Sequence, residues 1–342
     1  MGATIKDIAA KTGLSITTIS LVLNNKESRI AAKTKELILK TARELNYIPN
    51  QNAISLVTKE SKTFGYIVTD IANPFFAELG KGISAKAAES GYNIILCDTE
   101  DSYELTMKFL HILVSQNVDG IILTLSDEIR DAKMKAVAAF LTDHPVPVVL
   151  IERTDPLLMS DCVIGNHFQG SYMAAAHLIG LGHRNFGCIA GPAHLDATKY
   201  RLKGFRQALE ENGIPFRNEL VAWGNYHIES GFAGARQLLE TDPRITAIHA
   251  FNDMMAYGAL EYLKERNIKV PEQISVVGFD DIFFSKILYV PLTSVALPIQ
   301  EMGAHAVKLL TERVNKKDLA RRVDLLEPKL AVRQSTAKPQ KA

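Results

Sequence analysis

Cysteine and tryptophan are scarce in this chain of 342 residues, which holds three Cys and one Trp. The cysteines, Cys97, Cys162 and Cys188, are scattered through apolar runs and match neither a metal-ligand spacing nor a disulfide framework. Unclustered thiols in an odd number fit a reducing compartment, so we expect a cytoplasmic protein. No apolar run approaches the roughly 18 residues of a membrane helix, and we therefore expect no membrane span.

Other signatures are also missing. The opening MGATIKDIAAK lacks the apolar core of a signal peptide, so we expect no secretion signal. The sequence shows no Ser-His-Asp set, no paired carboxylates and no phosphate-binding loop, and we expect no enzyme and no cofactor. His194, His227 and His249 have no ligand-like spacing, which argues against a metal site.

The composition is that of a globular protein, with 47% hydrophobic and 23% charged residues. Its length predicts about two to three domains. The net charge of +1 hides an asymmetry, because residues 1–60 hold nine Lys or Arg against five Asp or Glu. A small basic head on a mildly acidic remainder is suited to phosphate contact by the head alone.

The most informative segment, residues 4–24, reads TIKDIAAKTGLSITTISLVLN. Thr4 and Asp7 have the spacing of a capping box, in which side-chain acceptors bind the free amides of a helix start. Gly13 can adopt a positive φ at a corner, and Ser15 is suited to cap a second helix. The segment therefore predicts two short helices joined by a tight turn, the architecture of a DNA-reading helix-turn-helix.

The second helix has two distinct faces. Ile19, Val22 and Leu23 recur at helical spacing and can pack on the first helix. The opposite face is free to enter a major groove. An ordinary helical hairpin is the alternative interpretation of these residues taken alone. The opposite face consists of Ile16, Thr17, Ser20, Leu21 and Asn24.

A third helix is predicted over residues 32–47, with one apolar stripe formed by Leu37, Ile38, Thr41, Ala42 and Leu45. Pro49 breaks this pattern. Residues 50–56 could form one or two further turns, which are too short to be stable alone, so their order should depend on a partner. Residues 58–63 are polar and read as a linker.

From Phe64 onward, β-branched apolar runs alternate with amphipathic helical segments such as residues 76–90, 103–116 and 170–181. This alternation predicts parallel sheets covered on both faces. The first five strands would form one sheet and the later ones another. Because ligands bind beyond the carboxyl ends of such strands, a cleft is expected between the sheets. The runs are FGYIVTDI, YNIILCD, GIILTLS, VPVVLIE, CVIGN, NFGCIAG, AIHAFND and ISVVGFD.

Motifs in this order, from about Thr4 to Thr336, resemble the lactose-repressor-type (LacI/GalR) family of bacterial transcriptional regulators. The resemblance implies an α/β fold with an N-terminal all-α helix-turn-helix head and a bilobed, periplasmic-binding-protein-like core of two doubly wound parallel sheets linked by three crossovers. It also implies a homodimer on a near-palindromic operator. The motifs include LNYIPN, DIANPFFAEL, VDGIIL, HLIGLGHRNFGCIAGP, RLKGF, FNDMMAYGAL, ISVVGFDD and LAVRQST.

The resemblance also implies a domain organisation. Residues 1–47 would be the DNA-binding domain and residues 48–62 the hinge helix and linker. The N-subdomain of the effector core would hold residues 63–161 with about 292–322. The C-subdomain would hold residues 162–291 with about 323–336, followed by a tail over residues 337–342.

By resemblance, Ile16, Thr17 and Leu21 stand at base-reading positions, while Ser20 and Asn24 would face phosphates. Many relatives have Arg where this chain has Leu21. Arg can grip guanine with two hydrogen bonds, whereas Leu offers apolar contact, for instance to a thymine methyl. The usual operator sequence is therefore not transferable, and Leu21 packing against its own domain is the alternative.

In the hinge, Leu56 corresponds to the family's wedge residue, which enters the minor groove with its counterpart across the dimer axis and parts the central base pairs. Asn50 and Ala53 would lie beside it. Ile54 stands where relatives often have Arg. A plain linker contact is the alternative role for Leu56.

The resemblance assigns the effector cleft to ten residues. Arg201, Asn252 and Asp280 match its polar positions, and a guanidinium, an amide and a carboxylate together can bracket adjacent hydroxyls. Tyr226 could stack on a sugar ring. Core packing for Phe75 and Phe76 and a helix cap at Asp280 are the alternatives. The remaining cleft residues would be Thr69, Asn73, Phe75, Phe76, Thr124 and Glu152.

One position departs from the pattern, because Gly165 stands where many relatives have Asp. The pocket should therefore differ locally from common sugar pockets.

Three classes of function follow. The first is a DNA-binding regulator, a repressor, whose operator affinity is controlled by a small polar effector, a sugar or derivative. The second is a regulator that answers to a phosphorylated carrier protein. The third, a sugar-binding protein without DNA function, conflicts with the basic head and with the expected absence of a signal peptide.

Overall fold

The structure is a computed structural model that describes residues 3–23, 29–48, 60–316 and 319–340. The chain divides into two compact units, Met1–Ser61 and Lys62–Ala342, each of which has its own core. None of the helices in the described ranges is both long and apolar enough to cross a membrane.

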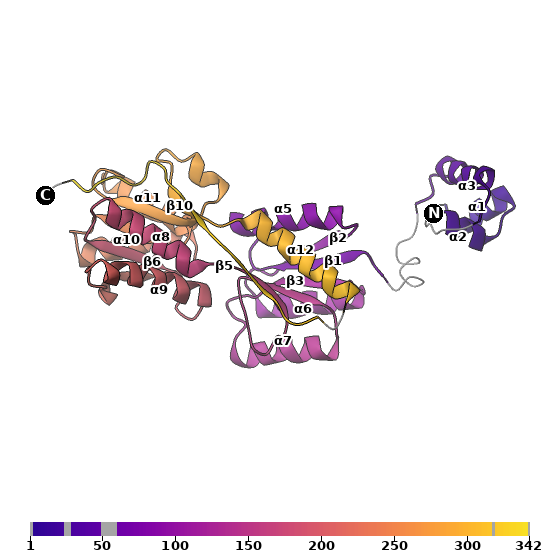
Figure 1. The fold of residues 1–342 in the computed structure, drawn as a ribbon, viewed down its shortest axis with the longest axis horizontal. Coiled ribbons are helices and arrows are strands. Elements are labelled where there is room, and N and C mark those ends of the chain that lie inside the picture. The colour runs from indigo at the N-terminus through magenta and orange to yellow at the C-terminus, as the bar shows by residue number, and fades with distance from the viewer. Residues whose placement is uncertain (1–2, 24–28, 49–59, 317–318, 341–342) are drawn as a thin grey trace. The chain divides into compact units, whose positions relative to one another are not determined.

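In the described residues of the head, the helices are α1 (Ile5–Thr12), α2 (Ile16–Leu23) and α3 (Ala32–Glu44) (Figure 1). The core of the head consists of buried aliphatic side chains from all three helices. Helices this short are not stable alone, so packing in this core stabilises them. The third helix ends at Glu44, three residues before the predicted end. These core residues are Ile8, Ile19, Val22, Ile38 and Ala42.

Local signals in the head work as the sequence predicts. The Thr4 amide and hydroxyl donate to Asp7 Oδ2 at 2.7 and 2.8 Å, which completes the capping box of α1. Gly13 has φ +70° at the corner. The Thr18 amide donates to Ser15 Oγ at 3.1 Å, so Ser15 caps the start of α2. One prediction for α3 is wrong. Leu37, which was assigned to the buried apolar stripe, is 46% exposed.

The second unit, Lys62–Ala342, has two lobes, each built on a six-stranded sheet (Figure 1). The sheet of the first lobe is parallel throughout, in the order β11-β5-β4-β3-β1-β2. Its strands are β1 (Thr63–Val68), β2 (Asn93–Asp98), β3 (Gly120–Thr124), β4 (Val148–Ile151), β5 (Asp161–Gly165) and β11 (Val323–Leu326). Its helices are α5 (Pro74–Glu89), α6 (Tyr103–Ser115), α7 (Asp131–Asp143) and α12 (Ile299–Asn315).

The sheet of the second lobe has the order β12-β10-β9-β8-β6-β7. It is parallel except for the edge pair β10–β12, which is antiparallel and was not predicted. Its strands are β6 (Phe186–Ala190), β7 (Val221–Trp223), β8 (Ala247–Ala250), β9 (Ser275–Asp280), β10 (Thr293–Ala296) and β12 (Lys329–Ala331). Its helices are α8 (His167–Gly180), α9 (Asp196–Glu211), α10 (Ile228–Thr241), α11 (Asp253–Glu265) and the short η1 (Asn218–Leu220) and η2 (Phe283–Lys286).

Three crossovers link the lobes, and they correct the predicted subdomain boundaries. The chain passes from β5 to α8, from β10 to α12 and from β11 to β12. Strand β5 therefore belongs to the first lobe, although a boundary at residue 162 assigns most of it to the second. Strands β10 and β11 likewise lie in the lobes opposite to those predicted. The reason is that the chain leaves a strand at its carboxyl end, so each crossover follows the strand.

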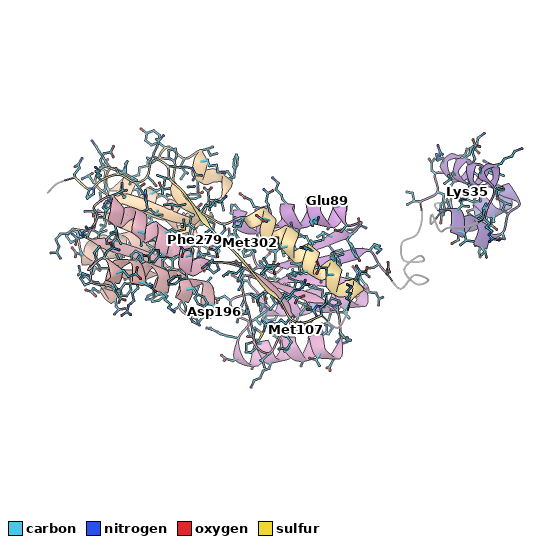
Figure 2. The ribbon with its side chains drawn as sticks, in the orientation of Figure 1. Lys35, Glu89, Met107, Asp196, Phe279 and Met302 are labelled. Carbon is cyan, nitrogen blue, oxygen red and sulfur yellow. The ribbon has the colours of Figure 1, made fainter. Side chains whose placement is uncertain are left out.

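Apolar strands fill both lobes, as their sequence runs predict. Phe279 in β9 and Met302 in α12 are fully buried, one in each lobe (Figure 2). Because both sheets point the carboxyl ends of their parallel strands toward the same region, the loops that follow those strands meet between the lobes.

Candidate effector cleft and DNA-reading helix

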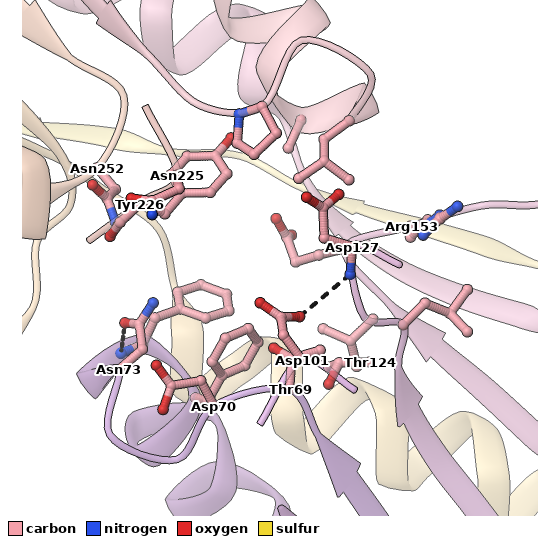
Figure 3. A pocket seen from close by; sticks show the side chains of 18 of the residues that line it. Thr69, Asp70, Asn73, Asp101, Thr124, Asp127, Arg153, Asn225, Tyr226 and Asn252 are labelled. Carbon is pink, nitrogen blue, oxygen red and sulfur yellow. Dashed lines mark hydrogen bonds between the residues drawn. The ribbon is translucent and has the colours of Figure 1, made fainter. Parts of the chain in front are cut away.

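A cavity of about 510 Å³ lies between the two lobes. Its walls are loops that follow the carboxyl ends of β1 to β4 in the first lobe and of β6 to β9 in the second. Figure 3 shows side chains from both walls. The structure brings all ten residues of the predicted cleft to this cavity. They are Thr69, Asn73, Phe75, Phe76, Thr124, Glu152, Arg201, Tyr226, Asn252 and Asp280.

Arg201 forms the floor of the cleft on the second lobe. It projects from α9, and its guanidinium carbon lies 3.8 Å from the centroid of the Phe279 ring. Its Nη1 donates to the Phe251 carbonyl and its Nε donates to His167 Nδ1 at 3.3 Å. Its Nη2 lies 3.5 Å from Asp280 Oδ1. These contacts fix the plane of the guanidinium beside the cavity.

Asn252 caps α11 through its side-chain oxygen, which accepts from the Met255 amide at 2.9 Å. Its Nδ2 donates to the Tyr226 carbonyl at 2.9 Å. The Tyr226 hydroxyl forms a hydrogen bond of 2.7 Å with Thr198 Oγ1. The backbone of Tyr226 has φ +69°. A non-glycine residue with positive φ is a strained position of the kind found at binding sites.

The wall from the first lobe is partly apolar. Phe75 and Phe76 pack edge to face with centroids 5.1 Å apart, and Phe75 is buried, so it contributes to the core as well as to the cavity. Asn73 caps α5 by accepting from the Phe75 amide at 3.1 Å (Figure 3). Thr124 donates to the Ile67 carbonyl at 3.0 Å. Several predicted cleft residues thus also hold local structure.

Glu152 lies beside Gly165, the position at which the sequence departs from the family pattern. Its Oε1 accepts from the Gly165 amide at 2.8 Å, and its Oε2 lies 2.7 Å from His167 Nε2. This carboxylate therefore occupies the space beside Gly165. Burial acts to raise the pKa of Glu152, but His167 and Arg201 outweigh burial and lower it.

Carboxylates that the sequence analysis did not single out also line the cavity, among them Asp70, Asp101 and Asp127 (Figure 3). The Asp127 amide donates to Asp101 Oδ1 at 3.3 Å. Beside the cleft, His194 Nε2 contacts Asp127 Oδ1 and thereby joins the two lobes. Each carboxylate lies just after the end of a strand, β1 for Asp70, β2 for Asp101 and β3 for Asp127, and that position is the signal that could have identified it.

Arg153 also lines the cavity, but its guanidinium is committed to backbone. Its Nη2 donates to the Ile129 carbonyl at 2.6 Å and its Nη1 to the Ser126 carbonyl at 3.3 Å. His167, on the floor behind Arg201, is 4% exposed and was not predicted. Its place directly after Asn166, at the start of α8, was the available signal.

Burial raises the pKa of Asp280 well above its usual value, and Arg201 offsets this only in part. A carboxyl whose pKa is raised by folding contributes stability below its unfolded pKa, and this contribution is lost as the pH rises through the folded pKa. We therefore expect the free energy of unfolding of the wild type, relative to Asp280→Asn, to fall as the pH is raised from about 4. Urea unfolding of both proteins from about pH 4 to 8 measures this difference.

Asp242 provides a control of opposite sign. Arg244 and Arg217 donate to this buried carboxylate, and they lower its pKa. Its contribution is present above the unfolded pKa and lost as the pH falls. Asp242→Asn should therefore cost most stability at neutral pH. Parallel pH profiles for Asp280→Asn and the wild type would contradict the assignment at Asp280.

The second helix of the head presents its predicted outer face to solvent. Ile16 is 44% exposed, Thr17 is exposed, and Ser20 and Leu21 are partly buried, while Ile19 and Val22 lie in the core. This arrangement leaves the face available for a major groove. Asn24, Asn50, Ala53 and Leu56, which were also predicted to contact DNA, lie outside the described residues.

The described ranges contain no group of three or more His, Cys, Asp or Glu side chains arranged to hold a metal ion. Cys97, Cys162 and Cys188 are free and buried. Burial raises the pKa of all three thiols.

A helix-turn-helix head and a two-lobed core with an interlobe cavity, joined in one chain, define a class, the DNA-binding regulators with a periplasmic-binding-protein-like domain. Comparison with known proteins agrees. Residues 4–50 match the family model described as "Bacterial regulatory proteins, lacI family", and residues 175–336 match the "Periplasmic binding protein-like domain". The chain belongs to the lacI family of bacterial transcriptional regulators.

Similar proteins span the whole chain. The "HTH-type transcriptional regulator DegA" of Bacillus subtilis is 38% identical over 337 residues, which cover 98% of this chain and 99% of DegA. The "HTH-type transcriptional repressor PurR" of Photobacterium profundum is 35% identical, with coverage of 97% and 98%. Both relatives are transcriptional regulators.

Solved structures of two relatives show the same architecture. The lac repressor dimer bound to operator and the anti-inducer ONPF is 29% identical, with a TM-score of 0.87 over 98% of this chain and 100% of that one. A complex of the transcriptional regulator CelR with cellobiose is also 29% identical, with a TM-score of 0.74 over 97% and 99%.

Proposed function

We propose that this protein is a homodimeric repressor that binds a near-palindromic operator and responds to a small polar effector, a sugar or a sugar derivative. The observation that carries the proposal is the convergence of Arg201, Asn252 and Asp280 on one interlobe cavity in a chain with a DNA-reading head. The relatives bound to operator and to cellobiose support it. The protein acts in the cytoplasm, without a cofactor and without catalysis.

The effector would be held by the floor of the second lobe, while the first lobe closes over it. A guanidinium, an amide and a carboxylate offer donors and acceptors to neighbouring hydroxyls. The ligand would shift the equilibrium between the open and closed states by the difference in its affinity for them. This shift would in turn change the operator affinity. Control by a phosphorylated carrier protein is the second candidate.

A thermal-shift screen with sugars, nucleosides, sugar phosphates and a phosphorylated carrier protein distinguishes the two candidates. A ligand present at 100 times its Kd stabilises the native state by about 2.7 kcal/mol, which is a readily measured shift. Stabilisation by a small molecule supports the cleft proposal. A response to the carrier protein alone would contradict it.

The dimer proposal has support in an apolar segment of the second lobe. Phe283, Phe284, Ile287 and Tyr289 lie within seven residues of each other, and each is at least half exposed. Such a cluster is typical of a surface that another chain covers. Sedimentation should show a dimer at micromolar concentration, and a stable monomer that binds operator one chain at a time would contradict the proposal.

In the head we propose base contacts by Ile16, Thr17 and Leu21, phosphate contacts by Ser20 and Asn24, and a minor-groove wedge at Leu56 flanked by Asn50 and Ala53. An apolar side chain at Leu21 favours a thymine methyl over guanine.

Selection of binding sites from random DNA should therefore give a two-fold symmetric sequence. Leu21→Ala should weaken the base preference at one position of each half-site. Each lost contact should cost about 1–3 kcal/mol of binding free energy, as a mismatched base pair does. Lys11→Ala serves as the matched control, because Lys11 pairs with Glu44 on the head surface. An unchanged preference in Leu21→Ala would remove this residue from the reading set.

A further inference from the structure

Two consecutive residues at the edge of the cleft have a backbone conformation that L-residues rarely adopt. Asp280 has φ +104° and Asp281 has φ +56°. Neither is a glycine, so the surrounding structure must hold the turn in place. The turn matters because it sets the direction in which the Asp280 carboxylate leaves β9.

Hydrogen bonds from the two backbone amides that follow Asp280 lead to one buried carboxylate, Asp253, while the Asp281 side chain pairs with Arg333 Nη1 at 2.6 Å. Asp253 Oδ2 accepts from the Ile282 amide at 3.0 Å. Its Oδ1 accepts from Ser294 Oγ at 2.5 Å, and Ser294 Oγ in turn accepts from the Asp281 amide at 3.1 Å. Both amides that follow Asp280 are therefore bound to Asp253, one directly and one through a hydroxyl.

Asp253 is not needed as a helix cap, because Asn252 already caps α11. It is fully buried, and burial raises its pKa to about 7, so a carboxyl at this position is costly. A carboxyl does, however, supply acceptor oxygens on two sides. The backbone makes room for it, since a Cβ at Gly278 would lie 2.1 Å from Asp253 Oδ1.

The same carboxylate also holds η2. Ser285 Oγ donates to Asp253 Oδ2 at 2.5 Å, and the Tyr257 hydroxyl lies 2.7 Å from Ser285 Oγ. The first residue of η2, Phe283, donates its amide across the lobes to Glu78 Oε1 of α5 at 3.0 Å. The carboxylate thus connects the turn at the cleft with a contact between the lobes.

We propose that Asp253 is a positioning residue of the effector cleft. It holds the strained turn at Asp280 and Asp281, keeps the Asp280 carboxylate beside Arg201, and fixes η2 against the first lobe. The inference rests on the proposed function in one respect, namely that Asp280 meets the effector. The geometry of the turn can be tested without any ligand.

The test is amide hydrogen exchange of the full chain, without ligand, followed by mass spectrometry over residues 279–287. Asp253→Asn removes one acceptor, and Ser294→Ala removes the bridging hydroxyl. We expect exchange in this segment to become at least about tenfold faster in both variants. Exchange in α9 should remain as in the wild type.

Ser335→Ala is the matched control. Its hydroxyl is equally buried in the same lobe, donates to the Val276 carbonyl at 2.6 Å and accepts from the Thr293 amide at 2.8 Å, but does not touch the turn. It should raise exchange around Thr293 and Val276 without a selective effect on residues 279–287. If Asp253→Asn proves too unstable to purify, Ser294→Ala against Ser335→Ala still decides the question.

A crystal structure of Asp253→Asn or Ser294→Ala gives the second readout. If Asp253 only stabilised the fold, the geometry of the turn in these variants would stay as in the wild type. We expect φ at Asp281 to leave the positive region and the Asp280 carboxylate to move away from Arg201. Wild-type exchange together with two positive φ values would overturn the proposal. A failed ligand screen would instead count against the effector proposal and leave these two readouts unaffected.

Discussion

Replacing Arg201 with Ala is expected to abolish the ligand response while basal operator binding stays nearly intact. The guanidinium is the buried cation on the cleft floor, stacked on Phe279 and beside Asp280. Loss of two charge-assisted hydrogen bonds to a ligand corresponds to on the order of 3–6 kcal/mol, or roughly 10² to 10⁴ in affinity. The substitution also leaves Asp280 buried without its cation.

The measurement is calorimetric titration with a ligand found in the thermal-shift screen, paired with operator binding with and without that ligand. Arg206→Ala is the matched control, because Arg206 lies on the same helix but pairs with Glu210 in solvent at 2.6 Å. It should respond as the wild type does. A normal response by Arg201→Ala would place the effector site elsewhere.

Removing the head is expected to produce the second large effect, a loss of at least about 10³ in operator affinity. Specific sites are typically bound 10³ to 10⁷ times more tightly than other DNA, and that margin comes from base contacts. The chain from Lys62 onward is a compact unit that holds the entire cleft but none of the proposed base-reading residues. It also lacks the excess positive charge of residues 1–60.

The fragment of residues 62–342 should keep the thermal shift with the same ligand. Together with Arg201→Ala, it separates the two functions in opposite directions: one variant binds DNA without responding, and the other binds ligand without reading DNA. Electrophoretic mobility shifts on the selected operator measure the first property. Sequence-specific binding by the fragment would show that residues outside the head read DNA.

The network at Asp253 adds a physical reason why cleft and lobe contacts could respond together. The turn after Asp280, Ser294 and η2 all bind one carboxylate, so displacement of the turn by a ligand would also displace β10 and the contact between Phe283 and Glu78. Strained turns held from several sides tend to have discrete arrangements. The crossover from β10 to α12 is one of the three links between the lobes.

Much of the protein could be predicted from sequence because its signals are local. Thr4, Asp7 and Ser15 cap helices through bonds three residues away, and Gly13 supplies the positive φ of the corner. Apolar runs at regular spacing predict two sheets of parallel strands. The ten cleft residues were assigned through family motifs, and the structure brings them to one cavity.

Other features depend on contacts between residues distant in sequence, and only the tertiary structure decided them. Strand β10 pairs with β9 in the second lobe and β11 pairs with β5 in the first, the reverse of the predicted assignment. The periodicity of a sequence does not specify which strands pair. The exposed side of Leu37 reflects how three helices pack. The contact of the Glu152 carboxylate with the Gly165 amide requires β4 and β5 to pair in the sheet. Asp253, adjacent to Asn252 in sequence, acquires its partners only when α11, β9 and β10 pack together, because a buried carboxylate is defined by the donors that folding places around it.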